Sequence, residues 1–325
     1  MKIIFISKNG DIIPLAQRVE QEGNDVSFFL CRDEEIIVDK HITDHGPELI
    51  VIDSPGFGSV STRLKKKGFP VLGGSLLTDK LSSDDIYNMS IFQMCGLAVT
   101  SHNGVPYLKV DVEGWFNGKG FANIIYTLDS VVFAGMKQDK IFKDGLGQLA
   151  PALARSGYTG PIWCTTFINK DNAYHVGLYA SFSASTILAM REGLKGRVTD
   201  TLYGMATGVN RMYMFKPGWF TAVELVLNPG RLFNDKHYDE KIEGISEDVM
   251  KHIWLYGVTA QGTRYLGKGG RIAVVTARGD TIREARRRVY RTIHNISIPN
   301  VLYLEKVGDK ATGQHAQIKS WGYIT

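Results

Sequence analysis

Short apolar runs alternate with amphipathic segments along the first 75 residues. Apolar runs at residues 2–7, 25–29, 49–53 and 70–73 have the length and composition of buried strands. Residues 13–22 and 60–67 repeat their apolar positions at helical spacing. Strands that alternate with helices predict a parallel, doubly wound sheet.

Ligands of such sheets bind at the carboxyl ends of the strands, so the loops at residues 7–10 and 54–58 are the positions to consider. Gly56 and Gly58 in the second loop are candidate ligand-binding residues. Neither loop has the spaced glycines of a nucleotide-binding turn, and a plain connecting turn is the competing interpretation.

The last strongly patterned segment is at residues 269–293. Two glycines lead into an apolar strand at residues 272–276, and a short turn follows. Thr281 and Glu284 have the spacing of a capping box and predict a helix start. Four apolar residues then recur at helical spacing and predict one buried stripe: Ile282, Ala285, Val289 and Ile293.

Asp280 and Thr281 precede this helix and are candidate ligand-binding residues, because backbone N–H groups gather at a helix N-terminus and bind phosphate there. Simple capping of the helix is the competing interpretation.

The middle of the chain predicts a mixture of helices and strands. Residues 79–96 read as one helix whose apolar contacts come from Leu81, Ile86, Met89, Ile91, Phe92 and Cys95. Further helices are predicted at residues 145–156, 185–192 and 198–204, and strands at residues 162–168, 174–182, 220–228 and 253–260.

Composition places the chain among ordinary globular proteins. Of its 325 residues, 44% are hydrophobic and 22% are charged. No apolar run approaches the roughly 18 residues of a membrane helix, and residues 1–7 do not read as a signal peptide. Three widely spaced cysteines do not predict a disulfide framework. A net charge of +5 does not by itself predict a nucleic-acid partner. We expect a cytoplasmic protein with no membrane partner.

Two motifs carry a family resemblance. Residues 269–285 read GGRIAVVTARGDTIREA, and residues 157–162 read GYTGPI. Both are similar to segments of glycinamide ribonucleotide synthetase (phosphoribosylamine–glycine ligase), an ATP-grasp ligase of purine synthesis. The resemblance implies an α/β protein with three parts: a doubly wound α/β domain at residues 1–77, an ATP-grasp remnant at 78–215, and a C-terminal α+β domain at 216–325.

The ATP-grasp part is shorter than the resemblance requires. In the family, a small lobe that clamps ATP lies between the positions occupied here by residues 97 and 110. Residues 99–106 leave no room for a strand–hairpin–helix lobe. The chain is therefore expected to be a truncated, degenerate homologue, a pattern that fits a viral source.

The family's metal-binding positions also differ. Aligned on Ala180 and Phe182, this chain has Gly177 and Tyr179 where the resemblance implies metal ligands, and Ser181 where it implies an arginine. We therefore expect no metal ligand at these positions. Glu113 is the remaining acidic candidate for a catalytic role in this part of the chain; a solvent-facing or lysine-paired glutamate is the competing interpretation.

Arginines are concentrated in the predicted helix after residue 281. Arg283, Arg287 and Arg291 are four residues apart and form one basic stripe. A solvated helix face is the competing interpretation, because few aromatic residues are interleaved with the arginines.

Three functions follow as hypotheses. The first is an inactive pseudoenzyme that needs no cofactor and binds a protein partner, a copy of itself or a nucleotide-like ligand. The second is a divergent ligase that uses ATP and Mg²⁺ to join glycine or another amino acid to a nucleotide-like amine. The third is an accessory protein that associates with nucleic acid.

Overall fold

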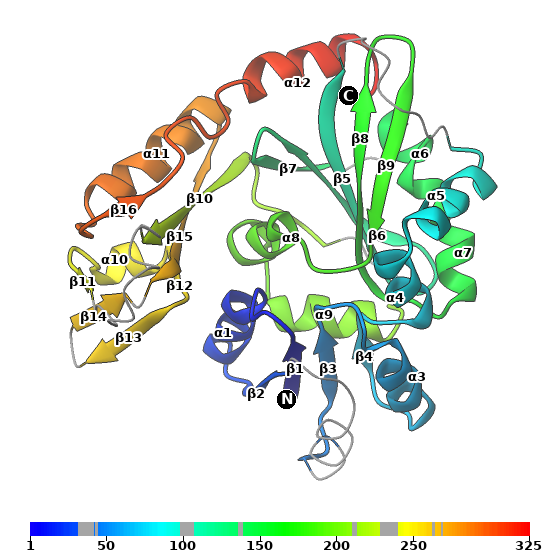
Figure 1. Cartoon of the computed structure of the whole chain (residues 1–325), viewed down its shortest axis with the longest axis horizontal. Helices are drawn as coiled ribbons and strands as arrows, with labels where there is room; N and C mark the ends of the chain where they lie inside the picture. Colours follow the sequence, from blue (N-terminus) through cyan, green and yellow to red (C-terminus); the bar gives the residue numbers. More distant parts are fainter. Residues whose placement is uncertain are drawn as a thin grey trace. The chain divides into compact units, whose positions relative to one another are not determined.

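The computed structural model describes residues 1–31, 42, 45–97, 107–135, 139–209, 213–227, 240–261, 264–267 and 269–325. This part of the chain forms two compact units (Figure 1). The first contains Met1–Leu128, Phe133–Lys216 and Gly313–Thr325, and the second contains Asp129–Val132 and Pro217–Thr312.

The first unit begins with the predicted parallel sheet. Its strands β1 (Lys2–Ser7), β2 (Asp25–Leu30), β3 (Leu49–Ile52) and β4 (Val71–Leu72) lie in the order β2-β1-β3-β4. All neighbouring pairs are parallel. Helix α1 (Ile13–Gln21) follows β1, and α3 (Gly58–Lys66) packs Val60 and Leu64 against the isoleucines of β1 and β3. The predicted N-terminal α/β lobe is confirmed.

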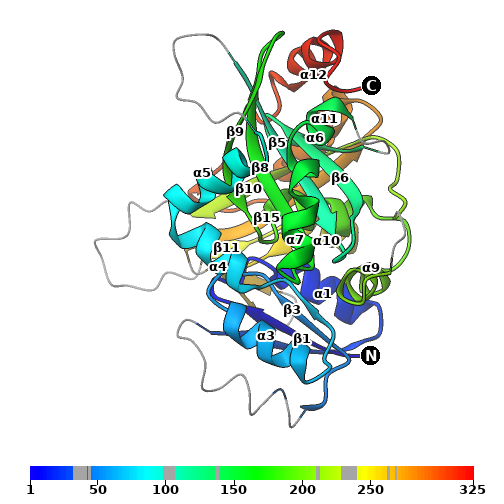
Figure 2. The same cartoon turned by 90° about the vertical axis from the view of Figure 1, so that its right-hand side faces the viewer.

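The prediction of one continuous helix at residues 79–96 is wrong. The structure has two helices, α4 (Leu76–Ser83) and α5 (Asp85–Met94), which lie beside strand β9 (Ala173–Tyr179) (Figure 2). Asp84 adopts an extended conformation between them and its side chain accepts the N–H of Tyr87 as the N-cap of α5. The break rotates α5, so Ile86 and Met89 are 77% and 44% exposed and not inward as predicted.

An antiparallel sheet forms the rest of the first unit. Strands β5 (Leu108–Phe116), β6 (Phe121–Leu128) and β8 (Gly160–Ile168) lie beside β9 in the order β6-β5-β8-β9, and β7 (Val131–Gly135) is next to β6. One side carries α6 (Lys140–Lys143), the 3-10 turn η1 (Leu146–Leu149) and α7 (Ala150–Arg155), and the other carries α8 (Ala184–Leu188) (Figure 1). The chain continues as a π-helical turn η2 (Ala189–Gly193) and helix α9 (Val198–Ala206).

Polar contacts fix helix α9 to the parallel lobe within this unit. The Glu22 carboxylate caps α9 by accepting the N–H groups of Val198 and Thr199, at 2.8 and 3.0 Å. Asn24 donates to the hydroxyl of Thr199 at 2.8 Å. The first two predicted domains thus lie in one compact unit, while the boundaries at residues 77 and 215 stay predictions.

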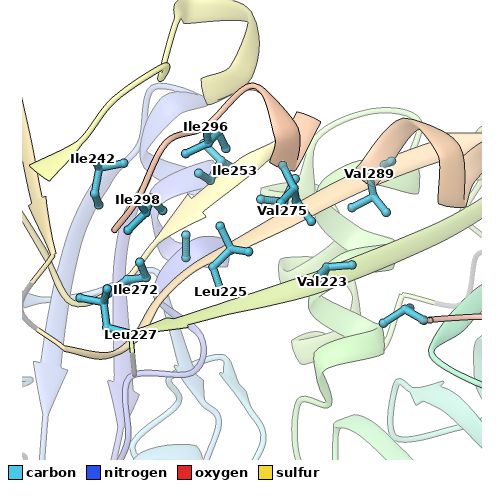
Figure 3. Packing of buried hydrophobic residues seen from close by; sticks show 14 residues of the cluster. Val223, Leu225, Leu227, Ile242, Ile253, Ile272, Val275, Val289, Ile296 and Ile298 are labelled. Carbon is cyan, nitrogen blue, oxygen red and sulfur yellow. The ribbon is translucent and has the colours of Figure 1, made fainter. Parts of the chain in front are cut away.

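The second unit is built on strands β10 (Trp219–Leu227), β15 (Gly270–Gly279), β12 (Ile253–Leu255) and β16 (Val301–Leu302). Helix α11 (Ile282–His294) packs on β15 and β10, and all four residues of its predicted stripe are buried. Figure 3 shows the apolar core between these elements. Strands β11 (Glu240–Ile242), β13 (Val258–Gln261) and β14 (Arg264–Gly267) form a separate small sheet. Short helix α10 (Glu247–Met250) precedes β12. Most of helix α12 (Ala311–Ser320), which follows the second unit in the chain, belongs to the first unit.

The single strand predicted at residues 253–260 is wrong. The structure divides it into β12, which pairs with β15, and β13, which pairs with β14. Tyr256 and Gly257 turn the chain between them, and Arg271 lies over the ring of Tyr256 with 4.2 Å between the guanidinium carbon and the ring centroid.

The ATP-grasp-like lobe is truncated. Only residues 98–106 separate Leu97, after α5, from Tyr107, before β5. A chain this short cannot form the small ATP-clamping lobe of the family. None of the described helices is long and apolar enough to cross a bilayer.

Candidate functional site

One face of the antiparallel sheet carries polar side chains in register. Residues directly opposite each other in antiparallel strands share a face. Glu113 of β5 lies opposite Trp163 of β8, and Trp163 lies opposite Tyr179 of β9. Asp111, two residues before Glu113, lies opposite Thr165. Helix α8 covers part of this face, which we call the polar sheet face.

Glu113 is the more buried of the two carboxyl residues, Asp111 and Glu113, on the polar sheet face. Its side chain is 3% exposed, and the Ser183 hydroxyl donates to its Oε2 at 2.5 Å. Its Oε1 has no hydrogen-bond partner among the described residues. Burial raises the pKa of Glu113 to about 8; the Ser183 hydrogen bond opposes this rise and the Asp111 charge adds to it. Glu113 therefore neither faces solvent nor pairs with a lysine, and its catalytic role stays a prediction.

Ser183 joins Glu113 to helix α8. Its hydroxyl also accepts the N–H of Thr186 at 3.0 Å, as the N-cap of that helix. One oxygen thus donates to the buried carboxyl group and accepts from the helix backbone. This hydroxyl therefore links Glu113 to the first turn of α8.

Asp111 has a more open environment than Glu113. The Thr165 hydroxyl donates to its Oδ1 at 2.7 Å, and the Lys109 ammonium lies 3.3 Å from its Oδ2. Its side chain is 29% exposed. Burial therefore favours the neutral form of Glu113 at pH 7. The polar sheet face thus combines a partly exposed carboxyl group, that of Asp111, and a buried one, that of Glu113, with hydroxyls.

The positions that the resemblance associates with metal binding have no ligand side chains. Gly177 is bulged out of the β8–β9 register, with φ +67°, a conformation that favours glycine. A Cβ added there would lie 2.8 Å from the ring of Tyr179. The Tyr179 ring itself stacks on Trp163, with 4.2 Å between the ring centroids.

This arrangement does not fit Mg²⁺ held by side chains in the family's manner, because that ion requires oxygen ligands and Gly177 has no side-chain oxygen. Among the described residues, no group of three or more His, Cys, Asp or Glu side chains is placed to hold a metal ion. Asn88 instead forms hydrogen bonds with the edge of β9. Its side-chain oxygen accepts the N–H of Leu178 at 3.1 Å, and its amide N–H donates to the C=O of Leu178 at 2.9 Å.

The candidate glycines of the N-terminal lobe already have an anionic partner. Gly56 and Gly58 donate their N–H groups to the two carboxylate oxygens of Asp79, at 2.6 and 2.7 Å. Asp79 belongs to α4, so the contact fixes this loop against the next helix. A ligand role for Gly56 and Gly58 stays a prediction.

Asp280 and Thr281 cap helix α11. The Thr281 hydroxyl accepts the N–H of Glu284 at 3.1 Å, and Glu284 accepts the N–H of Asp280 at 2.9 Å. The capping interpretation is confirmed, with the return bond going to Asp280 and not to Thr281. Phosphate binding by either residue stays a prediction.

The three arginines of the predicted basic stripe are exposed on α11. Arg283, Arg287 and Arg291 follow the helix on the side away from its buried stripe, as their spacing predicts. They belong to the second unit, whereas Glu113, Gly177 and Tyr179 belong to the first. The candidates are therefore divided between the two units.

Ser183, Asp111 and Trp163 belong to the polar sheet face and were not predicted as site residues. A local signal exists for Asp111, because Lys109, Asp111 and Glu113 alternate with valines and must share one face of a strand. Ser183 is 70 residues from Glu113 in the chain. No local pattern marks that contact.

Several solved structures have the same overall fold as this chain. Phosphoribosylamine–glycine ligase from Thermotoga maritima superposes with a TM-score of 0.68 and 13% sequence identity, over 94% of this chain and 99% of that one. N5-carboxyaminoimidazole ribonucleotide synthetase from the same organism gives a TM-score of 0.58 and 12% identity, over 91% and 99%. A multifunctional pyruvate carboxylase from Rhizobium etli gives 0.67 and 12%, over 100% of this chain and 37% of that one.

No family model matches the chain. Identities of 12–13% establish the architecture and not the activity. The chain has the fold of phosphoribosylamine–glycine ligase and related ATP-grasp enzymes, in a form that is truncated between α5 and β5.

Proposed function

We propose that this protein is a catalytically inactive relative of the ATP-grasp ligases that acts as a binding or scaffold protein. The proposal rests on two residues of strand β9, Gly177 and Tyr179. Gly177 holds a bulge with positive φ, and the Tyr179 ring lies on Trp163 where metal-binding side chains are expected.

The fold does not depend on the chemistry that we propose has been lost. Its stability comes from buried apolar residues, such as Ile6 and Ile52 in the parallel lobe and Val112 and Ile162 in the antiparallel sheet. Site residues contribute little to such a core, so they can be replaced while the architecture persists.

A turnover assay tests the proposal. The purified chain is incubated with Mg-ATP, glycine and phosphoribosylamine, and phosphate release is compared with that of an active phosphoribosylamine–glycine ligase. We expect no release above the rate without protein. Release that requires both glycine and phosphoribosylamine contradicts the proposal.

A divergent ATP-dependent carboxylate–amine ligase is the second candidate, and the carboxyl pair of the polar sheet face favours it. Asp111 and Glu113 differ in burial, and burial raises the pKa of Glu113 to about 8, as expected for a group with the role of a general acid. If the turnover assay is positive, Glu113→Gln is expected to lower the rate at least 100-fold. Ser90→Ala, on helix α5, serves as the control.

The partner of an inactive scaffold is either another protein or a second copy of this chain. Light scattering over a range of concentrations tests self-association, since a dimer doubles the mass of 36.1 kDa. A constant monomer mass leaves a different protein or a nucleotide-like ligand as the bound species. We propose the cytoplasm as the location.

A further inference from the structure

Helix α11 exposes a row of arginines on a fixed framework. Arg283, Arg287 and Arg291 are all exposed, and we call them the arginine row. The opposite side of the helix is anchored in the core of the second unit through Ala285 and Val289, which are both fully buried. The backbone that carries the row is therefore held in place before any partner binds.

The other two arginines of α11 have structural partners. The Arg286 Nε donates to the carbonyl oxygen of Val307 at 2.7 Å, and its guanidinium forms an ion pair with Asp309. Arg288 donates to the carbonyl oxygen of Arg278 at 3.0 Å and to Glu284 at 2.6 Å.

The arginine row has no such partners. Within the described part of the chain, no hydrogen bond or ion pair uses Arg283, Arg287 or Arg291. Glu284 is the sole acidic residue of α11, and its carboxylate is engaged by Arg288 and by the N–H of Asp280. The three guanidinium groups of the row are therefore exposed, and the one carboxylate of their helix, that of Glu284, is hydrogen-bonded to Asp280 and Arg288. These hydrogen bonds and the charge of Arg287 lower the pKa of Glu284.

We propose that the arginine row binds the phosphate backbone of nucleic acid. Successive members are four residues apart, so the row spans about 12 Å of helix at a rise of about 1.5 Å per residue. A nucleic-acid strand presents one phosphate per roughly 3.4 Å of duplex axis, so the row spans about 3.5 such intervals and its three guanidinium groups can each contact a phosphate of one strand. Guanidinium groups also bind phosphate oxygens in a bidentate manner.

The surroundings of the row indicate phosphate contact and not base recognition. Tyr290 is the one aromatic residue of α11, and its hydroxyl donates to the carbonyl oxygen of Leu304 at 2.7 Å and accepts the N–H of Val307 at 3.0 Å. Its ring packs against Tyr303. Because this ring is committed to the fold, it does not serve as a stacking platform for bases. We expect binding that is independent of base sequence.

The inference does not rest on the proposed loss of ligase activity, because the arginine row lies in the other unit. Salt dependence gives the first test. Fluorescence anisotropy with a labelled 20-base-pair duplex should give an affinity that falls with salt at a logarithmic slope of about −2.7 for three phosphates. That slope corresponds to a loss of about 40-fold between 50 and 200 mM NaCl.

A charge-matched pair of variants gives the second test. Arg283→Gln, Arg287→Gln and Arg291→Gln combined should abolish measurable binding, and glutamine keeps a high helix propensity so that α11 persists. The control combines Lys66→Gln, Lys67→Gln and Lys170→Gln, which removes the same charge from exposed positions elsewhere. Thermal unfolding of each variant verifies that the fold is kept.

Three results would overturn the inference. They are no duplex binding by the unaltered chain at 50 mM NaCl, equal weakening by the row variant and the lysine control, or tighter binding of a polyglutamate peptide than of the duplex. If the row variant alone fails to fold, the single substitutions Arg283→Gln, Arg287→Gln and Arg291→Gln decide the matter. Each should weaken binding and reduce the magnitude of the slope by about 0.9, and an unchanged slope in all three would overturn the inference.

Discussion

The ring of Tyr179 stacks on the ring of Trp163, with 4.2 Å between their centroids and 24° between their planes. Tyr179 occupies a position where the family resemblance implies a metal ligand. Its ring lies along the polar sheet face and no carboxylate accompanies it at Gly177. The proposed inactivity of this ATP-grasp relative depends on this stacked pair of rings and on Gly177.

Restoring a glutamate at position 177 should destabilise the protein without creating activity. Gly177 has φ +67°, and a new Cβ would meet the Tyr179 ring at 2.8 Å. We expect Gly177→Glu to lower the free energy of unfolding by roughly 1–3 kcal/mol. Urea unfolding measures this change. Gly120→Ala is the control, because no heavy atom lies within 4 Å of the added Cβ and φ is not positive; an equal effect of both substitutions would refute the strain argument.

Stability should fall as pH rises from 4.5 to 8 because of Glu113. Its pKa is about 8 in the folded protein and 4.5 without the fold. The unfolded state therefore loses this proton first, which favours unfolding by roughly 5 kcal/mol above pH 8. Glu113→Gln cannot ionise and should remove this dependence.

Urea unfolding of both proteins at pH 5 and pH 8.5 tests the role of Glu113. The difference in unfolding free energy between Glu113→Gln and the original chain should grow with pH in favour of the variant. His294→Gln, at an exposed position, serves as the control for general pH effects. A difference that stays constant with pH would show that Glu113 is already ionised in the folded protein.

His175 should produce the opposite trend on the acid side. It is 2% exposed and its Nδ1 lies 3.0 Å from the Thr166 hydroxyl oxygen. Burial lowers its pKa to about 4, against the opposing effect of the Asp144 backbone and charge. Since the unfolded histidine takes up a proton near pH 6.5, stability should fall by about 3 kcal/mol between pH 6.5 and pH 4.

Proton NMR of the histidine ring measures the pKa of His175 directly. A resonance that does not shift between pH 7 and pH 5 agrees with the prediction. Titration of the His175 resonance near pH 6.5 would contradict it.

Asn88 should be essential for the edge of β9. Its amide makes three buried hydrogen bonds, two with the Leu178 backbone and one to the carbonyl oxygen of Leu81 at 3.0 Å. Asn88→Ala leaves these groups without partners and should cost about 3 kcal/mol. Gln93→Ala, at an exposed position of the same helix, should change stability by less than about 0.5 kcal/mol in the same denaturation experiment.

Segments with local signals were predicted well. The parallel lobe follows from apolar runs separated by amphipathic helices, and β1 has the bounds predicted for it. The start of α11 follows from Thr281 and Glu284, whose capping contact involves only neighbours in the chain. In both cases the information that fixes the element lies within a few residues.

Segments fixed by distant contacts were not predicted. Strands β6 and β7 were missed, because the turn between them uses Asp129 and Ser130, which have φ of 45° and 64° where glycine or asparagine would be the usual signal. The burial of Glu113 depends on Ser183, which comes from another element. The exposure of Ile86 depends on a helix break at Asp84 that its periodicity does not indicate.

The direct test of the central claim is the thermal unfolding midpoint of the purified chain with increasing Mg-ATP, beside an active phosphoribosylamine–glycine ligase as positive control. A ligand that binds the folded state stabilises it by about 2.7 kcal/mol at 100 times its Kd. We predict no change of the midpoint at any Mg-ATP concentration that raises the midpoint of the positive control. A midpoint that rises steadily with Mg-ATP, and does not rise with ATP in EDTA, would contradict the account.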